Sequence, residues 1–593
     1  MPRPRNVQEW LHWLEVGAGA RRVRLAAALL GVLVLSLLVS WSQFRGATSE
    51  ATLAQADTGR QIAAGDGFTT LVNTPQAVAF LAGRGVPFDP ARPYPELYQA
   101  PLYSLTIAGG LAVLPASWRE ALFARAPAAP NGFAADYFLL GLNLVLFWLA
   151  AWLTYGLGRR LFDARTGWVA ALAVLVSVGL WQQTVAVNGT PLLMVLALAA
   201  FHVWHRADAA AEARGAAGWL AALGAVCGLL FLAEYSAGTL VAVALGYVWL
   251  RFPGRGRWPA LGLVALGFAL VAGPWIARNL ALTGSPVALA VQNVALRAGD
   301  PTAEPAAQHL MLSAELPALS LDKLGNKTLT GLQENLKSRL WSGGGMWLTA
   351  FFVAGWLYTY RAAPVNRLRW TLAAALVVLL VAQAALNSGE TERLAAVWLA
   401  PVIVVFGAGF FFVLLGSHAV LGAWPRACAT VLLLLQALPL LHDALEPRRL
   451  HFQYPPYAPG LFLGLHRELA HRDATGRFGA MADVPAGMAW YGRQRVWAQP
   501  LKLRDFYAIA LEQPIGALLL TPRTLDRPFF TDLGGRTPAP GSLERVRSRF
   551  GEWGGVYAGL LTGTFPPEFP LRSPLKLDEN LYVLLDPALP PAR

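Results

Sequence analysis

The chain has 593 residues, of which 55% are hydrophobic and only 14% are charged, and its mean hydropathy is +0.44. Soluble globular chains usually carry about 25% charged residues. These values exclude an intrinsically disordered protein, a coiled coil and a nucleic-acid-binding domain of ordinary composition. The apolar residues lie in charge-free tracts too long for soluble helices, so the sequence predicts a polytopic α-helical membrane protein.

The net charge of +13 and the isoelectric point near 10 have two explanations. A basic surface could bind nucleic acid, but the basic residues lie mostly between the apolar tracts, which favours the positive-inside rule of membrane topology. We therefore predict no nucleic-acid partner. The two cysteines, Cys227 and Cys428, lie within apolar tracts and provide neither a disulfide framework nor a zinc ligand set.

The apolar tracts predict the membrane helices in chain order, since one crossing of a bilayer needs about 20 mainly apolar residues. The charge-free tracts are residues 25–44, 97–118, 137–158, 166–205, 215–233, 235–250, 258–277, 340–360, 370–389, 394–425 and 427–442. The tract 166–205 is twice the necessary length and is interrupted at Asn188-Gly189-Thr190-Pro191, so it should hold two helices. The sequence thus contains twelve candidate segments.

The segment 97–118 decides the topology because Pro101, the pair Gly109-Gly110 and Pro115 interrupt it. If it crosses the membrane, the arginines of the following short loops face outside. If it is re-entrant or interfacial, they all become cytoplasmic, as the positive-inside rule requires. These arginines are Arg159, Arg160, Arg165, Arg206, Arg214, Arg251, Arg255, Arg257, Arg361, Arg367, Arg369 and Arg426. We therefore predict about 11 transmembrane helices and large outer loops at about 45–136 and 278–339.

Three regions follow from this topology. Residues 1–24 form a cytoplasmic tail, because the first tract follows a basic cluster without a suitable cleavage site and reads as an uncleaved anchor. Residues 25–442 form the transmembrane domain. Residues 443–593 are expected to form a small extracytoplasmic α/β domain, with short apolar runs at Phe478–Met481, Ala517–Leu520 and Leu581–Leu585 and a helix from Leu503 to Glu512. The expected location is the cell (inner) membrane.

Unusual polar residues gather on the predicted outer face. Taken singly, each has an ordinary explanation: Glu50 could be a solvated loop carboxylate, and Arg278 could extend to the lipid headgroups. Together, carboxylates and arginines from three distant outer loops face one membrane surface beside a re-entrant apolar helix. This arrangement suits a lipid-linked anionic substrate, because arginines bind phosphate oxygens through charge-assisted hydrogen bonds.

The order of these motifs resembles the GT-C glycosyltransferases, and more narrowly the protein O-mannosyltransferase and lipid A aminoarabinose transferase group (glycosyltransferase family 39-like). The matching stretches are Glu50, Gly65-Asp66-Gly67-Phe68, Gln99-Ala100-Pro101-Leu102-Tyr103, Pro274 through Pro286 with its Arg278-Asn279 pair, and Glu392-Arg393 with Pro401. The similarity covers roughly residues 20–420, and the Arg-Asn stretch is its most specific element.

The chain departs from the family pattern at three places. The acidic pair is reduced to Glu50, with Asp57 as a competing assignment, and the family's lysine before Pro-Pro is replaced by Gln99. The second outer turn, near Asn188-Gly189-Thr190, has no carboxylate. Hard cations favour carboxylate oxygens, so a divalent metal is only weakly supported, and no cofactor is assigned.

The resemblance implies transfer of a hexosyl or pentosyl group from a polyprenyl-phosphate sugar to an unidentified protein, lipid or glycan acceptor on the outer face. Glu50 is then expected to be the base, with Asp57 as the alternative. Phosphate and sugar would be bound by Arg278, Asn279, Arg393, Glu392, Gln99, Tyr98 and Tyr103. No metal ligand is assigned.

Two other classes of protein remain open. A lipid-linked sugar flippase or transporter would usually show inverted repeats and ionisable residues near the bilayer midplane. The sequence has no evident repeat, and Glu234, the single charge between the adjoining tracts 215–233 and 235–250, falls at an outer turn between two spans. A non-catalytic membrane scaffold, or a degenerate enzyme, is the second alternative.

Overall fold

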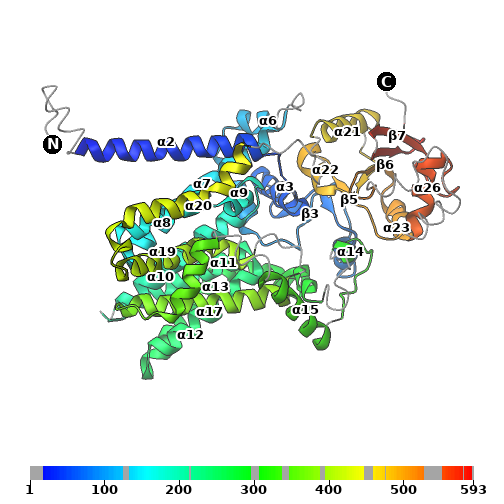
Figure 1. Cartoon of the computed structure of the whole chain (residues 1–593). Coiled ribbons are helices and arrows are strands. Elements are labelled where there is room, and N and C mark those ends of the chain that lie inside the picture. The colour runs from blue at the N-terminus through cyan, green and yellow to red at the C-terminus, as the bar shows by residue number, and fades with distance from the viewer. Residues whose placement is uncertain are drawn as a thin grey trace.

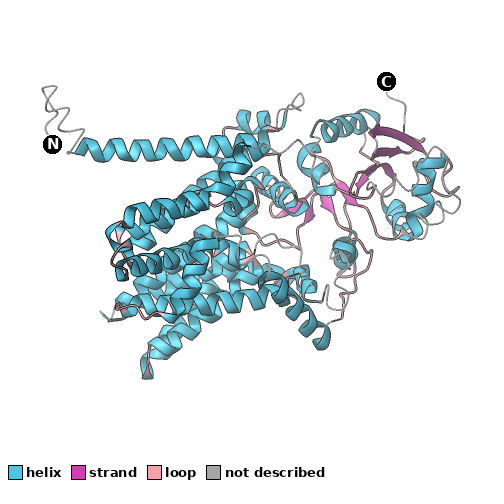
Figure 2. Ribbon diagram, viewed as in Figure 1, coloured by secondary structure: helices cyan, strands magenta, loops and turns pink. Residues whose placement is uncertain are grey.

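The computed structural model describes residues 18–47, 49–124, 133–212, 215–295, 306–318, 320–336, 346–387, 394–445, 459–473, 476–525, 551–578 and 580–589. Long helices form a bundle, and a smaller sheet-containing part lies beyond one end of it (Figure 1). The start of α2 (Ala18–Gln43) lies at the opposite end of the bundle (Figure 1). The described strands lie in the smaller part and at its junction with the bundle (Figure 2).

The bundle contains the helices that the apolar tracts predicted. Seven helices among the described residues are long and apolar enough to cross a membrane, and the bent pair α8–α9 adds an eighth candidate. The bundle helices are α2, α7 (Ala134–Leu161), α8 (Ala164–Leu175), α9 (Val178–Val185), α10 (Thr190–Glu212), α11 (Ala217–Ala233), α12 (Leu240–Arg251), α13 (Arg257–Thr283), α16 (Met346–Ala354), α17 (Ala363–Leu386), α18 (Ala395–Trp398), α19 (Ala400–Ser417) and α20 (Pro425–Leu445).

Three predicted spans fall on shorter helices. The tract 215–233 is the 17-residue α11, the tract 235–250 is the 3-10 helix η1 (Tyr235–Thr239) followed by α12, and the tract 340–360 is described only from residue 346. The predicted total of eleven therefore stays a prediction. The break at residues 188–191 is confirmed, and a second break that the sequence did not reveal bends α8 against α9 by 53°.

The first large loop carries its own short helices: α3 (Glu50–Ala64), α4 (Pro75–Ala82), α5 (Leu102–Val113) and α6 (Ala116–Ala124). The helix α5 occupies the segment that decided the topology. Its 12 residues rise by about 18 Å, which is less than the hydrocarbon thickness of about 30 Å. A helix of this length is in keeping with a segment that does not cross, as the sequence suggested.

Glycines let α11 and α13 approach each other closely. A Cβ atom built at Gly224 would lie 2.0 Å from the Val264 carbonyl oxygen, and one built at Gly267 would lie 2.0 Å from the Ala221 carbonyl oxygen. Small residues at helix crossings are the usual means of packing helices in membranes, where lipid removes the hydrophobic driving force for association. Both positions therefore require glycine.

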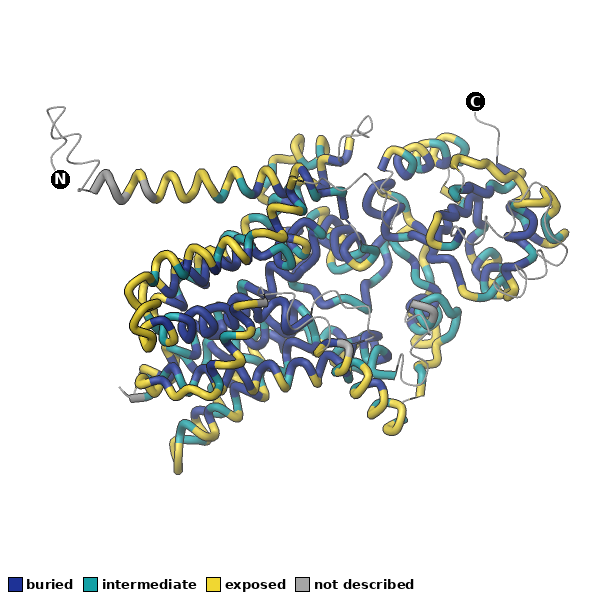
Figure 3. Tube along the Cα trace, viewed as in Figure 1, coloured by how far each residue is buried: buried dark blue, intermediate teal, exposed yellow. Residues whose placement is uncertain are grey.

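Much of the length of helix α2 is exposed (Figure 3), and many of its exposed residues are apolar. Leu29 and Leu37 are each 62% exposed, and Trp41 is 87% exposed. An apolar face of this kind is suited to hydrocarbon rather than water. The chain therefore has the character of a membrane protein.

The six-stranded sheet has the order β2-β5-β4-β6-β8-β7. The strands β2, β5, β4 and β6 are parallel, and β8 is antiparallel to both of its neighbours, β6 and β7. The strands are β2 (Val72–Asn73), β4 (Gly479–Ala482), β5 (Val496–Ala498), β6 (Ile515–Leu520), β7 (Ser573–Asp578) and β8 (Leu581–Leu585). The three apolar runs predicted as strands are confirmed, and so is the helix α23 (Leu503–Glu512). The sequence did not reveal that β2, from the first large loop, extends this sheet beside β5. A separate two-stranded pairing joins β1 (Thr69–Thr70) to β3 (Tyr94–Pro95).

Helices cover both faces of the larger sheet. Ala480 and Ala482 of β4 share a core with Trp490 of α22 (Pro485–Gly492), whereas Met481 shares a core with Phe506 of α23. This alternation follows from the period of two along a strand. The helix α26 (Gly554–Thr562) lies on the same side as α23.

Candidate functional site

The helix α3 begins with a capping side chain, at the end of the bundle that adjoins the sheet-containing part (Figure 1). Ser49 Oγ accepts the backbone N–H of Thr52 at 3.3 Å, as is usual for serine before a first helical turn. Glu50 follows at the first helical position and is half-buried. Its Oε2 accepts the backbone N–H of Ala486 at 3.0 Å, in the first turn of α22. One oxygen of the predicted base is therefore engaged in holding α22 against α3.

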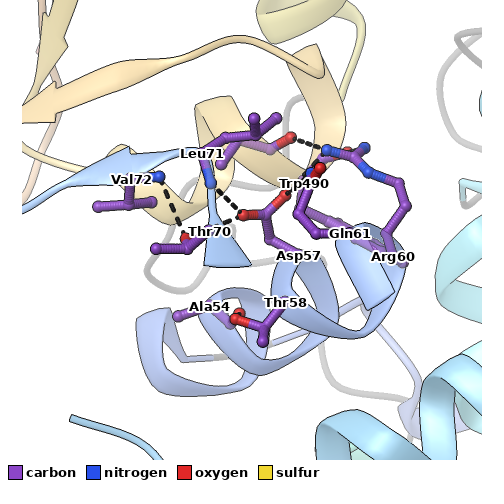
Figure 4. A network of polar contacts seen from close by, with 10 residues as sticks. Ala54, Asp57, Thr58, Arg60, Gln61, Thr70, Leu71, Val72 and Trp490 are labelled. Carbon is purple, nitrogen blue, oxygen red and sulfur yellow. Dashed lines mark hydrogen bonds and ion pairs between the residues drawn. The ribbon is translucent and has the colours of Figure 1, made fainter. Parts of the chain in front are cut away.

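Asp57 lies about two turns further along α3. It is fully buried, and its carboxylate accepts four hydrogen bonds (Figure 4). Oδ1 accepts from Arg60 Nη2 at 2.9 Å and from Gln61 Nε2 at 3.2 Å. Oδ2 accepts from Thr70 Oγ1 at 3.0 Å and from the Leu71 backbone N–H at 2.8 Å. A carboxylate offers about four such positions. This saturation favours a structural role for Asp57, which anchors the turn before β2.

Arg60 completes the link between α3 and α22. Its Nη1 donates to the Trp490 carbonyl at 2.9 Å, and its Nη2 donates to the Ala489 carbonyl at 2.7 Å. On the other side of α22, Asp136 of α7 accepts from Trp490 Nε1 and Tyr491 Oη, each at 3.0 Å. The sheet-containing part is thereby fixed to the first loop and to the bundle by buried polar contacts.

Arg278, near the end of α13, lies against two aromatic rings that also contact each other, with their centres 4.6 Å apart. Its guanidinium carbon is 4.5 Å from the centre of the Trp275 ring and 5.2 Å from that of Phe68. Nη2 donates to the carbonyls of Phe68 and Glu96, and Nη1 donates to Asn279 Oδ1 at 3.1 Å. Of its five N–H donors, the Nε–H and one on Nη1 make no hydrogen bond with the described residues. Stacking therefore orients a cation that keeps donors for an anion.

Glu96 is the carboxylate of this neighbourhood. It is 6% exposed, and its Oε1 accepts the backbone N–H groups of Tyr98 at 2.7 Å and Gln99 at 3.1 Å. Burial raises the pKa of Glu96, while the two N–H groups and the charge of Arg278 oppose that rise. Its Oε2 makes no hydrogen bond with the described residues. The motif comparison passed over Glu96; the available signal was a carboxylate three residues before the start of the Gln99–Tyr103 stretch.

Tyr98 and Gln99 lie beside Glu96, as their sequence positions require. Tyr98 Oη donates to Gln76 Oε1 at 3.2 Å, and its ring lies 4.2 Å from that of His309, whose pKa is lowered to about 4 by burial. The backbone carbonyl of Gln99 accepts from Tyr235 Oη at 3.2 Å. The half-buried side-chain amide of Gln99 makes no hydrogen bond with the described residues. Both residues therefore belong to the neighbourhood of Arg278.

Tyr103 lies elsewhere, in the core. It is fully buried, and its Oη contacts Asn143 Oδ1 at 3.0 Å and donates to the Val187 carbonyl at 2.6 Å. This placement favours a structural role at the break between α9 and α10 over a place in a sugar site. Asn279 is also fully buried, and its Nδ2 donates to the Pro286 carbonyl at 3.0 Å, so it orients Arg278 and the turn after α13.

Two predicted residues, Glu392 and Arg393, lie outside the described residues. The described residues hold no group of three or more His, Cys, Asp or Glu side chains arranged for a metal ion. Glu50 and Asp57, the nearest candidates, already accept hydrogen bonds from protein donors. The described side chains therefore do not assemble a site for a divalent metal.

Comparison with known proteins agrees with this architecture. The family model for dolichyl-phosphate-mannose-protein mannosyltransferase matches residues 138–277, from α7 into α13. The crystal structure of the Archaeoglobus fulgidus oligosaccharyltransferase, a complex with Zn and sulfate, is similar over 85% of this chain and 69% of its own, with a TM-score of 0.51 and 13% sequence identity. The chain has the GT-C fold. The resemblance found in the sequence is thereby confirmed.

A second solved structure is also similar to this GT-C chain. ArnT from Cupriavidus metallidurans, bound to undecaprenyl phosphate, matches 96% of this chain and 98% of its own, with 13% identity and a TM-score of 0.49. None of the curated proteins matches the sequence. Within the GT-C chain, the residues described above fall into two groups: Glu50, Asp57 and Arg60 hold α22, and Glu96, Arg278 and their neighbours form the candidate site.

Proposed function

We propose that the chain transfers a sugar from a polyprenyl-phosphate-linked donor to a hydroxyl or amine acceptor on the outer face of the membrane. The GT-C fold and the match to the mannosyltransferase family model support the reaction class. The observation that carries the proposal is Arg278, packed on aromatic rings beside the buried Glu96. Among the described residues, two N–H donors of this cation and Oε2 of this carboxylate make no hydrogen bond.

Arg278 is proposed to bind the donor phosphate. Its Nε–H and remaining Nη1–H can reach phosphate oxygens in the paired geometry that guanidinium favours. When the sugar leaves, negative charge grows on those oxygens, and a fixed cation stabilises it without reorganising. Lysine would lose both the paired geometry and the stacking on Phe68 and Trp275.

Glu96 is proposed as the base, in preference to Glu50. The acceptor oxygen or nitrogen forms a bond to the anomeric carbon, the bond from that carbon to the phosphate oxygen breaks, and the phosphate keeps the electron pair. The acceptor proton moves to Glu96 Oε2. A well-placed base contributes roughly 10²–10⁴-fold to such a rate. Glu50 is the alternative base; Glu96 is ranked first because it adjoins Arg278, whose charge acts on the pKa of its carboxyl.

The remaining assignments follow from this site. Gln99 and Tyr98 are proposed to contact the sugar, Asn279 to position Arg278, and Arg393 with Glu392 to assist at the phosphate.

We further propose that the N-terminal tail is cytoplasmic and that the region after residue 442 is extracytoplasmic, in the inner membrane. The N-terminal end of α2 and the sheet lie at opposite ends of the bundle, which supports that orientation (Figure 1).

The test uses purified full-length protein with a panel of polyprenyl-phosphate hexoses and pentoses and a set of membrane acceptors. We expect transfer by the wild type, and at least a hundredfold loss in Glu96→Gln and in Arg278→Ala. Arg84→Ala is the matched control, since Arg84 lies in the same outer region but stacks on Phe80 instead. Wild-type activity in both site variants would overturn the assignment, and movement of intact donor across liposomes without transfer would favour a flippase.

A further inference from the structure

The turn between α12 and α13 lies at an end of the bundle that the proposed reaction does not use. It contains the 3-10 helix η2 (Gly254–Gly256). The end of α12 that precedes the turn lies away from the sheet-containing part (Figure 1). From Arg257 to Arg278, α13 rises by about 32 Å, which is close to the hydrocarbon thickness of about 30 Å. The turn therefore lies at the membrane surface opposite the candidate site.

Two arginines of this turn have no acidic partner among the described residues. Arg255 is exposed and makes no hydrogen bond or ion pair with them. Arg257 donates through Nε to one backbone carbonyl at 3.3 Å, and neither of its Nη groups bonds to a described residue. By contrast, Arg251 of α12 and Arg367 of α17 both pair with the buried Asp208, at 3.0 and 2.7 Å. The turn therefore carries two positive charges that the described part of the chain does not neutralise.

Exposed apolar side chains flank these arginines. The three largest are exposed by 43, 85 and 68%, namely Trp249, Leu250 and Trp258. The guanidinium carbon of Arg257 lies 3.9 Å from the centre of the Trp249 ring, and that ring lies 5.8 Å from the ring of Trp258. A Cβ atom built at Gly254 would meet nothing within 4 Å, so the described residues leave the approach to the turn open. Tryptophan is enriched where a membrane meets water, because its ring is amphipathic.

We propose that this turn binds the headgroup of an anionic phospholipid. Arg255 and Arg257 contact its phosphodiester, since guanidinium groups bind phosphate oxygens through charge-assisted hydrogen bonds. Leu250 and Trp258 lie against its acyl chains. Basic residues beside a membrane attract anionic lipids in preference to neutral ones, and a zwitterionic headgroup would bring its ammonium group close to the second arginine. The site does not depend on the proposed reaction or its base, so either proposal can fail without the other.

The experiment titrates purified full-length protein in mild detergent with one lipid at a time and measures bound lipid by native mass spectrometry. The probes are phosphatidylglycerol, phosphatidylcholine with the same acyl chains and, separately, inorganic phosphate. We expect phosphatidylglycerol to bind about tenfold more tightly than phosphatidylcholine, and inorganic phosphate, which has no acyl chains, not to displace it. The double variant Arg255→Gln with Arg257→Gln should weaken binding of phosphatidylglycerol about tenfold and leave that of phosphatidylcholine unchanged, because both positive charges are lost.

The double variant Arg165→Gln with Arg361→Gln is the matched control and should keep most of the affinity for phosphatidylglycerol. Both arginines are exposed at the same end of the bundle, before α8 and α17 respectively, and their loss changes the net charge by the same amount. If the first double variant fails to fold, Arg255→Gln alone serves in its place and should weaken binding several-fold. Equal losses in the two double variants, equal wild-type affinity for the two lipids, or displacement of the lipid by inorganic phosphate would each overturn the proposal.

Discussion

Oε2 of Glu50 accepts the backbone N–H of Ala486 at 3.0 Å, so the first residue of α3 is bonded to the first turn of α22. Arg60, on the same helix α3, donates to the carbonyls of Ala489 and Trp490 near the other end of α22. A negative charge thus meets the positive end of the α22 dipole and a positive charge meets its negative end. The charge pattern of α3 is explained by docking of the sheet-containing part.

The first prediction concerns Glu50. In Glu50→Gln, the side-chain carbonyl can still accept from Ala486, so we expect transfer to stay within a few-fold of the wild type. Glu50→Ala should lower the thermal unfolding midpoint, because a hydrogen bond to a charged group is worth about 1.5–3 kcal/mol. Thermal unfolding and transfer rate should be measured on both variants. A loss of transfer in Glu50→Gln with unchanged unfolding would make Glu50 the base.

The second prediction concerns Arg60. Arg60→Ala removes one partner of a buried ion pair and leaves Asp57 charged and unpaired, which costs about 3–5 kcal/mol. We expect a lower unfolding midpoint and faster proteolysis of the sheet-containing part. The double variant Asp57→Asn with Arg60→Ala should recover part of the loss, since no buried charge then lacks its partner. Additive losses in the double variant would argue against this coupling.

The third prediction is the pH dependence of transfer. Burial raises the pKa of Glu96 above its ordinary value of 4.5. A base acts only when ionised, so the transfer rate should rise with pH through this raised pKa. The folded chain also binds that proton more tightly than the unfolded chain, so the carboxyl's contribution to stability is lost as pH rises through the same pKa. Rate and unfolding profiles should share a midpoint above 4.5, and a rate that does not vary with pH there would exclude Glu96 as the base.

Much of the fold could be predicted from the sequence, because long charge-free tracts and short apolar runs are strong indicators of membrane helices and buried strands. Charge-free tracts marked the long helices, and the interruption at Asn188 to Pro191 marked a break between two of them. The run Ala517–Leu520 marked a strand that is buried on both faces. The pairing of β2 with β5 was beyond reach, since two residues carry no periodicity and their partner lies more than 400 positions away.

The candidate site was predicted only in part, for a physical reason. Arg278 was found because its motif is specific, and its stacking is consistent with the proposed role. Glu50 and Asp57 were chosen as the acidic residues that match the family pattern after the first span, but each also accepts from a donor that only folding brings close, Ala486 for Glu50 and Leu71 for Asp57. Sequence alone does not distinguish a carboxylate that holds a helix from one that remains available to a substrate.

The fourth prediction concerns helix packing. Gly267→Ala would place a Cβ atom 2.0 Å from the Ala221 carbonyl oxygen, so α11 and α13 would have to separate. We expect a lower unfolding midpoint and less monodisperse protein in gel filtration. Gly262→Ala, on the same helix with nothing within 4 Å, is the matched control and should be neutral. Equal behaviour of the two variants would contradict the close crossing.

The most direct measurement of the central claim is the single-turnover transfer rate of Glu96→Gln beside that of Glu50→Gln, with saturating donor at a pH where the wild type is fully active. Our assignment predicts a fall of about a hundredfold or more for Glu96→Gln and a rate within a few-fold of the wild type for Glu50→Gln. The opposite order, or a wild-type rate in Glu96→Gln, would contradict it.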